Sequence, residues 1–229
     1  MTDFDGKLVL RVENLSKSYD YNKAVDGISF DVKEGDFIIL LGPNGAGKST
    51  ILKCIMNLIK SYTGKISLDA SPAYLPEKKN LYFSYTVDKL LDISKSLKFA
   101  LNVTKCASLL KEFDIPLNEK ISNLSLNEVS LVYFSLVISQ SSSIYIFDEP
   151  TWGLDPLYKE KVIKYIKNLS TDGNTILITI HEPYPVNEFD GKLLIINEGK
   201  IVYCQKERDS LDNKSFADFY KRVLKGETK

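Results

Sequence analysis

The first part of the chain alternates hydrophobic and polar positions with a period of two residues, which predicts strands with one buried face. Two such segments are present, with hydrophobic positions at Leu8, Leu10 and Val12 and then at Ile28, Phe30 and Val32. We expect these segments to form half-buried antiparallel strands. A polar turn at residues 34–36 leads into the apolar run of residues 37–41, which predicts a third strand.

The pattern then predicts a helix and a short extended segment. The helix is expected to begin at Lys48 and to end near Ile59. Residues 61–64 contain a glycine after polar residues and predict a turn. Residues from about 66 to 75 predict one short extended piece.

The spacing of hydrophobic residues changes to a helical period from residue 86 to residue 138. They recur three or four positions apart, at Val87, Leu90 and Leu91 and again at Ala107, Leu109, Leu110 and Phe113. This spacing is typical of helices with one apolar stripe. The sequence therefore predicts an all-helical insertion over residues 83–140.

Sheet character returns after the helical insertion. The apolar runs at residues 143–149 and 175–180 are continuous, which indicates parallel strands buried on both faces. Between them, Asp155-Pro156 predicts the start of a helix with a buried stripe at Val162, Ile163, Ile166 and Leu169. Residues 192–203 predict a hairpin, and residues 216–224 predict a short amphipathic helix that packs against the core. The order of elements indicates an α/β protein.

The composition limits the class of protein. The 229 residues suit one large domain, and the 30 acidic and 30 basic residues cancel. Without a basic excess the chain is not expected to bind nucleic acid. No signal segment opens the chain, and no apolar run approaches the roughly 20 residues that span a bilayer. Cys54, Cys106 and Cys204 are widely spaced and predict free thiols in a reducing, cytoplasmic compartment.

A glycine-rich stretch links the strand at residues 37–41 to the following helix. It reads Gly42-Pro43-Asn44-Gly45-Ala46-Gly47-Lys48-Ser49-Thr50 and fits G-x-x-x-x-G-K-[ST] at every fixed position. Glycines let backbone N–H groups surround a phosphate, and the helix N-terminus adds positive potential. Lys48 can then reach the β- and γ-phosphates, while the Ser49 hydroxyl can bind Mg²⁺. A chance glycine turn is the alternative, but the strand–loop–helix context favours a nucleoside triphosphate site.

Two acidic residues stand at the end of the strand predicted at residues 143–149. Asp148 and Glu149 stand at its carboxyl end, where open parallel sheets bind ligands. Asp148 is expected to hold Mg²⁺ through its water shell, and Glu149 to orient and polarise the attacking water. The alternative is that both acids merely cap a strand before Pro150. His181, the only histidine, follows the neighbouring strand, so we expect it near the γ-phosphate rather than in a purely structural role.

The order of these motifs resembles the ATP-binding subunit of an ABC transporter. The motifs are, in chain order, the phosphate loop, the helical insertion, Asp148-Glu149, Gly153-Leu154-Asp155 and His181. The resemblance covers the chain up to about residue 205. It implies an α/β fold: a P-loop NTPase core of ABC ATPase type with an N-terminal antiparallel β-subdomain and an inserted α-helical subdomain. The single domain, 1–229, would comprise a core at 1–82 and 141–205, a helical subdomain at 83–140 and a helical tail at 206–229.

The resemblance also implies roles for individual residues. Tyr19 matches the position of an aromatic residue that stacks on adenine; the alternative is a core or surface tyrosine. His181 would contact the γ-phosphate, and the loop at 153–155 would communicate across a dimer. Two subunits are expected to close head to tail, with ATP held between the phosphate loop of one and the signature motif of the other.

Two positions depart from the family pattern. Glu77 stands where glutamine is usual; its carboxylate can offer an oxygen to Mg²⁺ but adds negative charge near the phosphates. The signature Leu-Ser-Gly-Gly-Gln is replaced by Leu124-Ser125-Leu126-Asn127-Glu128, which keeps Ser125 and loses both glycines. Asn127 adds a side chain where the backbone must come close to the nucleotide, and Glu128 adds negative charge. We expect weak closure and slow turnover at sites that use this signature.

The resemblance therefore implies a cytoplasmic ATPase subunit that uses ATP and Mg²⁺ and sits on the inner face of the membrane, bound to an integral membrane transporter subunit. Leu75-Pro76-Glu77 is similar to single-domain subunits of exporters. The second ATP-binding subunit could be a copy of this chain or a different, signature-bearing chain. Two other classes stay open: a soluble non-transport ABC-type ATPase, which the compact insertion disfavours, and a regulatory subunit with little hydrolysis, which Glu149 disfavours.

Overall fold

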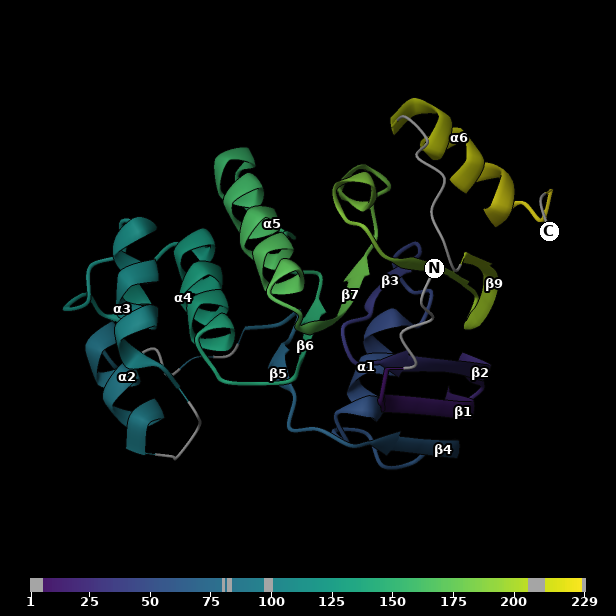
Figure 1. The fold of residues 1–229 in the computed structure, drawn as a ribbon, viewed down its shortest axis with the longest axis horizontal. Helices are drawn as coiled ribbons and strands as arrows, with labels where there is room; N and C mark the ends of the chain where they lie inside the picture. Colours follow the sequence, from purple (N-terminus) through teal and green to yellow (C-terminus); the bar gives the residue numbers. More distant parts are fainter. Residues whose placement is uncertain (1–5, 80, 82–83, 97–100, 206–212, 228–229) are drawn as a thin grey trace.

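The computed structural model describes residues 6–79, 81, 84–96, 101–205 and 213–227. The strands are β1 (Leu8–Tyr19), β2 (Asn22–Lys33), β3 (Phe37–Leu41), β4 (Thr63–Leu68), β5 (Ala73–Leu75), β6 (Ile144–Asp148), β7 (Thr175–Ile180), β8 (Lys192–Asn197) and β9 (Lys200–Gln205). The helices are α1 (Lys48–Ile55), α2 (Val87–Ser96), α3 (Val103–Glu112), α4 (Leu126–Ile138), α5 (Pro156–Thr171) and α6 (Asn213–Leu224), with short 3₁₀ helices η1 (Ile121–Asn123) and η2 (Tyr184–Glu188). They form two sheets and a helical end (Figure 1).

The N-terminal sheet has the strand order β2-β1-β4, and both pairings are antiparallel. Leu10 pairs with Val32 of β2 on one side and with Leu68 of β4 on the other. Leu10, Val12, Ile28 and Val32 are buried and Phe30 is partly buried in one cluster with α1 and the main sheet, as their period of two predicts. Leu8 departs from the pattern, because a register shift between Leu8 and Leu10 puts Val9 in the cluster in its place. The expected antiparallel β-subdomain is confirmed.

The main sheet has the strand order β5-β6-β7-β3-β8-β9. All neighbouring strands are parallel except β8 and β9, which form the predicted hairpin. β3, β6 and β7 are buried along their whole length. Asp148 of β6 pairs with Thr179 of β7, and Leu41 of β3 pairs with Ile180. The residues that follow these three strands therefore meet at one edge of the sheet.

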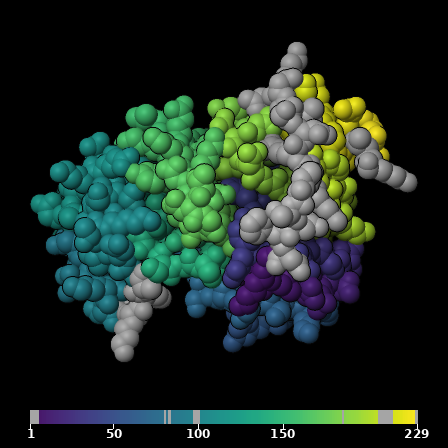
Figure 2. All heavy atoms as spheres, in the orientation of Figure 1, coloured from purple at the N-terminus to yellow at the C-terminus, as the bar shows by residue number. Residues whose placement is uncertain are grey.

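Helices α2, α3 and α4 lie between β5 and β6 in the sequence and form the end of the molecule opposite the N-terminal sheet (Figure 1). Figure 2 shows the same division, with the teal helical end on one side and the purple strands on the other. The apolar stripes of the three helices join β5, β6 and α5 in one buried cluster. The inserted α-helical subdomain is confirmed as part of an α/β fold.

Two predicted segments differ from the structure near α1. The helix ends at Ile55, four residues earlier than expected, because Asn57 turns to a left-handed φ of 55° and its N–H bonds to the carbonyl of Cys54. The predicted turn at residues 61–64 is also wrong in its second half, since Thr63 and Gly64 open β4. Gly64 has φ +94°, and a Cβ there would lie 2.4 Å from the carbonyl oxygen of Glu13.

The single extended piece expected at residues 66–75 is in fact parts of two strands in different sheets. Residues 66–68 end β4 in the N-terminal sheet, whereas Ala73–Leu75 form β5 at the edge of the main sheet. The segment thus crosses between the two layers.

The C-terminal helix α6 packs against the core, with Phe216, Tyr220 and Val223 buried. The predicted boundaries at residues 82–83 and 206 lie outside the described residues. The three cysteines are free thiols: Cys54 and Cys106 are buried, and Cys204 is exposed. Within the described ranges, every helix is too short or too polar to cross a membrane.

Candidate functional site

The loop between β3 and α1 surrounds a cavity of about 250 Å³. Two of its glycines are required by close backbone contacts. A Cβ on Gly42 would lie 2.2 Å from the carbonyl oxygen of Ile196, and one on Gly47, whose φ is +103°, would lie 2.2 Å from that of Ala24. The loop is thus held against β8 and β2 at distances that only glycine permits. Its backbone can therefore surround a small anion at the N-terminus of α1.

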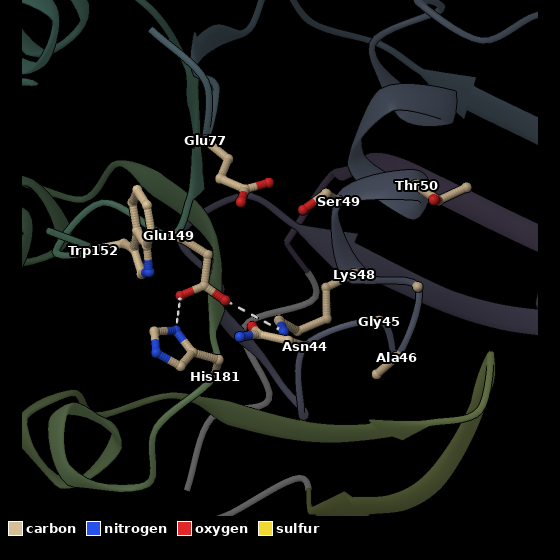
Figure 3. Close-up of a pocket in the computed structure, with 11 residues that line it drawn as sticks. Asn44, Gly45, Ala46, Lys48, Ser49, Thr50, Glu77, Glu149, Trp152 and His181 are labelled. Atoms are coloured by element: carbon tan, nitrogen blue, oxygen red, sulfur yellow. Dashed lines mark hydrogen bonds and ion pairs between the residues drawn. The ribbon is translucent and has the colours of Figure 1, made fainter.

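The cavity brings together most of the predicted site residues. Its lining is Asn44, Gly45, Ala46, Gly47, Lys48, Ser49, Thr50, Glu77, Glu149, Trp152 and His181 (Figure 3). Gly42 and Pro43 lie at the start of the same loop, and their carbonyl oxygens accept hydrogen bonds from the Lys48 ammonium at 2.7 and 3.1 Å. The Lys48 side chain is only 5% exposed, so its charge lies inside the loop.

Glu149 connects two other polar side chains on one wall of the cavity. Its Oε1 lies 3.3 Å from Lys48 Nζ, and its Oε2 lies 2.6 Å from Nδ1 of His181 (Figure 3). The backbone of Glu149 has a left-handed φ of 51°, which is unusual for a residue other than glycine. Because of this backbone conformation, the side chain of Glu149 points into the cavity, where it contacts both Lys48 and His181.

Asp148 lies directly behind the phosphate loop and is fully buried. Its Oδ1 accepts hydrogen bonds from the hydroxyls of Ser49 at 2.9 Å and Thr179 at 2.8 Å. Its Oδ2 is buried and has no hydrogen-bond partner among the described residues. Burial raises the pKa of the Asp148 carboxyl, and the two hydroxyl bonds oppose that effect.

Thr179 is a site residue that the sequence reasoning missed. Its hydroxyl donates to Asp148 Oδ1 and accepts the backbone N–H of Glu149 at 3.0 Å, so it fixes both acids at once. The available signal was a polar residue between Ile178 and Ile180 in an otherwise apolar strand. A buried hydroxyl at such a position needs hydrogen-bond partners.

Trp152 was also missed. The only tryptophan of the chain follows Glu149 by three residues, and its backbone N–H bonds to the Glu149 carbonyl at 3.1 Å. Its indole lines the cavity beside Glu149 and is about half exposed, at 55% (Figure 3). A large exposed aromatic residue in a short loop after the two acids was the available signal.

Tyr19 and Ser125 do not line the cavity. Tyr19 ends β1 and is 45% exposed, so the core alternative for this residue is wrong; the Lys17 ammonium lies 4.8 Å from the centre of its ring. Ser125 caps the N-terminus of α4, at the helical end of the molecule. The two residues are thus placed on the surface, outside the phosphate loop's own cavity.

The altered signature forms a closed hydrogen-bonded unit. Ser125 donates its backbone N–H and its hydroxyl to Glu128 Oε2, both at 2.7 Å, and Ser125 Oγ accepts the Glu128 backbone N–H at 3.3 Å. This is a capping box, in which the backbone N–H groups of Ser125 and Glu128 are each satisfied by the side chain of the other residue. Asn127 Nδ2 donates to Asp155 Oδ2 at 2.7 Å, which ties the start of α4 to the start of α5.

The family model for ABC transporters matches residues 25–152. An uncharacterized ABC transporter ATP-binding protein of Methanocaldococcus jannaschii is 31% identical over 92% of this chain and 82% of its own length. The SkfA peptide export ATP-binding protein of Bacillus subtilis is 28% identical over 85% of this chain and 87% of its own length. A zinc import ATP-binding protein of Ehrlichia canis is 32% identical over 86% and 83%.

Solved structures share the fold. An ATP-binding subunit of an ABC transporter superposes with a TM-score of 0.78 at 25% identity, covering 86% of this chain and 90% of that chain. A dimeric ATP-binding cassette in a post-hydrolysis state, bound to ADP and Pi, also gives 0.78 at 22% identity, covering 87% and 99%. The phosphate loop, the two acids and the strand-end histidine thus stand on an ABC ATPase fold, and the chain belongs to the ABC transporter family as an ATP-binding ATPase subunit.

Proposed function

We propose that this subunit binds ATP with Mg²⁺ in the cavity of the phosphate loop and hydrolyses it to power an integral membrane transporter subunit. The observation that supports the proposal best is the convergence of Lys48, Glu149 and His181 within hydrogen-bond or ion-pair distance on one wall of that cavity. A lysine for the phosphates, a carboxylate for the water and a histidine held by that carboxylate are the groups that phosphoryl transfer to water requires.

In this proposal the loop residues 42–50 bind the phosphates through backbone N–H groups, and Lys48 moves from the loop carbonyls to the β- and γ-phosphates. Glu149 orients a water for attack on the γ-phosphorus, and the bond from that phosphorus to the leaving oxygen of ADP breaks. The products are ADP and inorganic phosphate. His181 is held at Nδ1 by Glu149, and its Nε2, which lies 3.5 Å from Oε1 of the exposed Glu182, would contact the γ-phosphate instead of that carboxylate.

The residues beside Lys48 fit a magnesium ion. Ser49 supplies a hydroxyl, the Oδ1 of Asp148 lies 2.9 Å from that hydroxyl, and Glu77 brings a further carboxylate to the cavity wall. All three are oxygen ligands, which Mg²⁺ prefers, and Mg²⁺ in such sites relies on phosphates and waters for its remaining ligands. Bound Mg²⁺ would neutralise charge on the β- and γ-phosphates. Ser49 and Asp148 would hold it, with Glu77 nearby.

The proposal includes a second ATP-binding subunit, because the cavity is open and Ser125 lies outside it. Ser125 would face the nucleotide of that partner, and Tyr19 would stack on the adenine of this chain's own nucleotide. Glu128 fills the N-terminus of α4 with a carboxylate, which opposes a phosphate there. This supports weak closure between two copies of this chain, and favours a different subunit as the partner that completes the site.

The remaining parts of the proposal concern the transporter. The relatives include proteins named for export and for import, so the direction of transport rests on Leu75-Pro76-Glu77, which is similar to exporter subunits. We place the docking surface for the membrane subunit on the helical subdomain, 83–140, next to the core at 1–82 and 141–205 and the tail at 206–229. The subunit would bind the inner face of the membrane from the cytoplasm.

Two variants test the ATPase proposal. Lys48→Ala should weaken ATP binding at least about tenfold, because a buried charge-assisted bond to phosphate is lost. Glu149→Gln should keep ATP binding and reduce the hydrolysis rate at least about 100-fold. Binding is measured by calorimetry and hydrolysis by phosphate release, with Lys53→Ala on the same helix as the control. Unchanged ATP binding in Lys48→Ala, or unchanged turnover in Glu149→Gln, would contradict the assigned roles.

A further inference from the structure

The buried carboxylate of Asp148 is satisfied on one oxygen only. Ser49 and Thr179 both donate to Oδ1, at 2.9 and 2.8 Å. Oδ2 is buried and has no partner among the described residues. A buried carboxylate oxygen without a donor is costly, and in a functional site it marks the place where another group is expected to bind.

Tyr74 is directed toward the same place from the edge strand. β5 runs parallel to β6, and Tyr74 pairs with Ile146, so both side chains lie on one face of the sheet. Asp148 lies two residues, about 6.6 Å, further along that face. Leu75 and Phe147 lie on the opposite face, in the other apolar cluster. Tyr74 packs, partly buried, against the apolar cluster that contains Ile146, and its phenol is close enough to Asp148 for the charge of that carboxylate to act on its pKa.

The hydroxyl of Tyr74 is the complementary unpaired group. Its oxygen is buried and, like Asp148 Oδ2, has no hydrogen-bond partner among the described residues. Burial, followed by the charges of Asp148 and Glu77, raises the pKa of the Tyr74 phenol, so it stays a neutral donor. The sheet therefore places a donor and an acceptor, both buried and both unpaired, on one face behind the phosphate loop.

We infer that Tyr74 is a positioning residue for the metal side of the nucleotide site, whose hydroxyl holds Oδ2 of Asp148, directly or through one water, when Mg²⁺ and nucleotide bind. The inference rests on the proposed function, because it presupposes Asp148 as the carboxylate on the metal side. Groups that hold a ligating side chain in this way commonly change metal affinity by about 10- to 100-fold. Tyr74 does not line the cavity, so its effect on nucleotide is expected only through Asp148.

The test is Tyr74→Phe, which removes the hydroxyl and keeps the ring. ATP affinity is measured by calorimetry once with Mg²⁺ and once with EDTA, and Mn²⁺ affinity in the presence of ATP is measured by electron paramagnetic resonance. We expect ATP affinity in EDTA to stay within about twofold, while Mn²⁺ affinity and the Mg²⁺-dependent gain in ATP affinity fall about tenfold. Tyr145→Phe is the control, since Tyr145 on β6 lies on the opposite face of the sheet, donates its hydroxyl to the Gln140 carbonyl at 2.6 Å and lies outside the cavity lining.

Three outcomes would overturn the inference. Equal losses with Mg²⁺ and with EDTA would mean that Tyr74 supports the fold and not the metal side. Unchanged Mn²⁺ affinity, or the same loss in Tyr145→Phe, would also remove the special role of this hydroxyl. Failure of the unmodified protein to bind ATP in either condition would contradict the proposed function itself, which separates that failure from a failure of the inference about Tyr74.

Discussion

At the scale of single residues, Asp148 illustrates a conflict between stability and binding. The carboxylate is fully buried, and burial raises its pKa in spite of two hydroxyl hydrogen bonds. In the unfolded chain its pKa is near the ordinary value of about 3.9. Between that value and the raised value, the folded chain binds more protons than the unfolded chain. Its contribution to stability is therefore present at low pH and is lost as pH rises through the raised pKa.

Asp148→Asn should consequently stabilise the nucleotide-free protein at pH 8 by about 1 kcal/mol, in the range of other relieved functional sites. The amide keeps an acceptor for Ser49 and Thr179, and its NH₂ can donate to the Tyr74 hydroxyl. The gain should shrink as pH falls, because the wild-type carboxyl becomes protonated. Urea unfolding at pH 8 and pH 5 measures this difference, and Mg²⁺-dependent ATP binding should be lost in the same variant.

The control for this prediction is Asp36→Asn, since Asp36 accepts two hydrogen bonds from Lys192 at 2.7 Å. That change breaks an ion pair and should lower the free energy of unfolding instead of raising it. A loss of stability in Asp148→Asn at pH 8 would show that the hydroxyl bonds outweigh the cost of burying the charge.

At the scale of elements, the start of α4 is the segment that would meet the nucleotide of a partner subunit in the proposed function. The capping box joins Ser125 and Glu128 through their backbone N–H groups and side chains, so the carboxylate of Glu128 lies at the start of the helix. Asn127 is tied to Asp155 of the loop before α5. Leu126, between Ser125 and Asn127, is 86% exposed, so the start of α4 presents an apolar side chain to solvent where the family signature has glycine.

Glu128→Gln should remove the negative charge and keep the capping box, because glutamine serves equally at this position. We expect the free energy of unfolding to change by no more than about 0.5 kcal/mol. ATP-dependent self-association, measured in the Glu149→Gln background by analytical ultracentrifugation, should strengthen about three- to tenfold. Glu160→Gln makes the same charge change on α5 as the control, and an equal effect there would point to net charge and not to the helix N-terminus.

The sequence was sufficient to predict an element of the site where the hydrophobic pattern and the functional residues indicate the same structure. Glycines, Lys48 and Ser49 between an apolar strand and a helix indicated the loop, and the continuous runs ending at Asp148 and Ile180 indicated its neighbours. The end of α1 was wrong because Leu58 and Ile59 continue the apolar character of the helix after the chain has turned at Asn57. The helix ends because of the left-handed conformation of the single residue Asn57, which the sequence indicates only weakly.

Side-chain contacts between distant segments were harder to predict. Ser125-Leu126-Asn127-Glu128 is a capping-box pattern in the sequence itself, yet the resemblance to a phosphate-binding signature drew the interpretation to the missing glycines. The role of Thr179 depends on the register of β6 against β7, which places its hydroxyl beside Asp148. Strand periodicity indicates which faces are buried but not which neighbouring strand lies opposite.

At the scale of the whole molecule, the cavity and the start of α4 belong to different parts of the chain. The cavity lies at the edge of the main sheet, whereas α4 begins at the helical end, and Ser125 does not line the cavity (Figure 1). Residues 124–128 of one chain therefore lie apart from the cavity of that same chain. In the proposed function a second ATP-binding subunit would approach that face, and the charge of Glu128 would disfavour a second copy of this chain.

This argument predicts the behaviour of Glu149→Gln on a size-exclusion column with light scattering. The variant blocks hydrolysis and so would accumulate any ATP-bound dimer. We expect it to bind Mg-ATP yet remain at the monomer mass of 25.9 kDa at micromolar concentration, because the carboxylate of Glu128 occupies the helix N-terminus that would meet the partner's γ-phosphate. A stable species of twice that mass, formed only with Mg-ATP, would contradict this. It would mean that the capping box opens, that Ser125 engages nucleotide, and that two copies of this chain form the closed state without a different ATP-binding subunit.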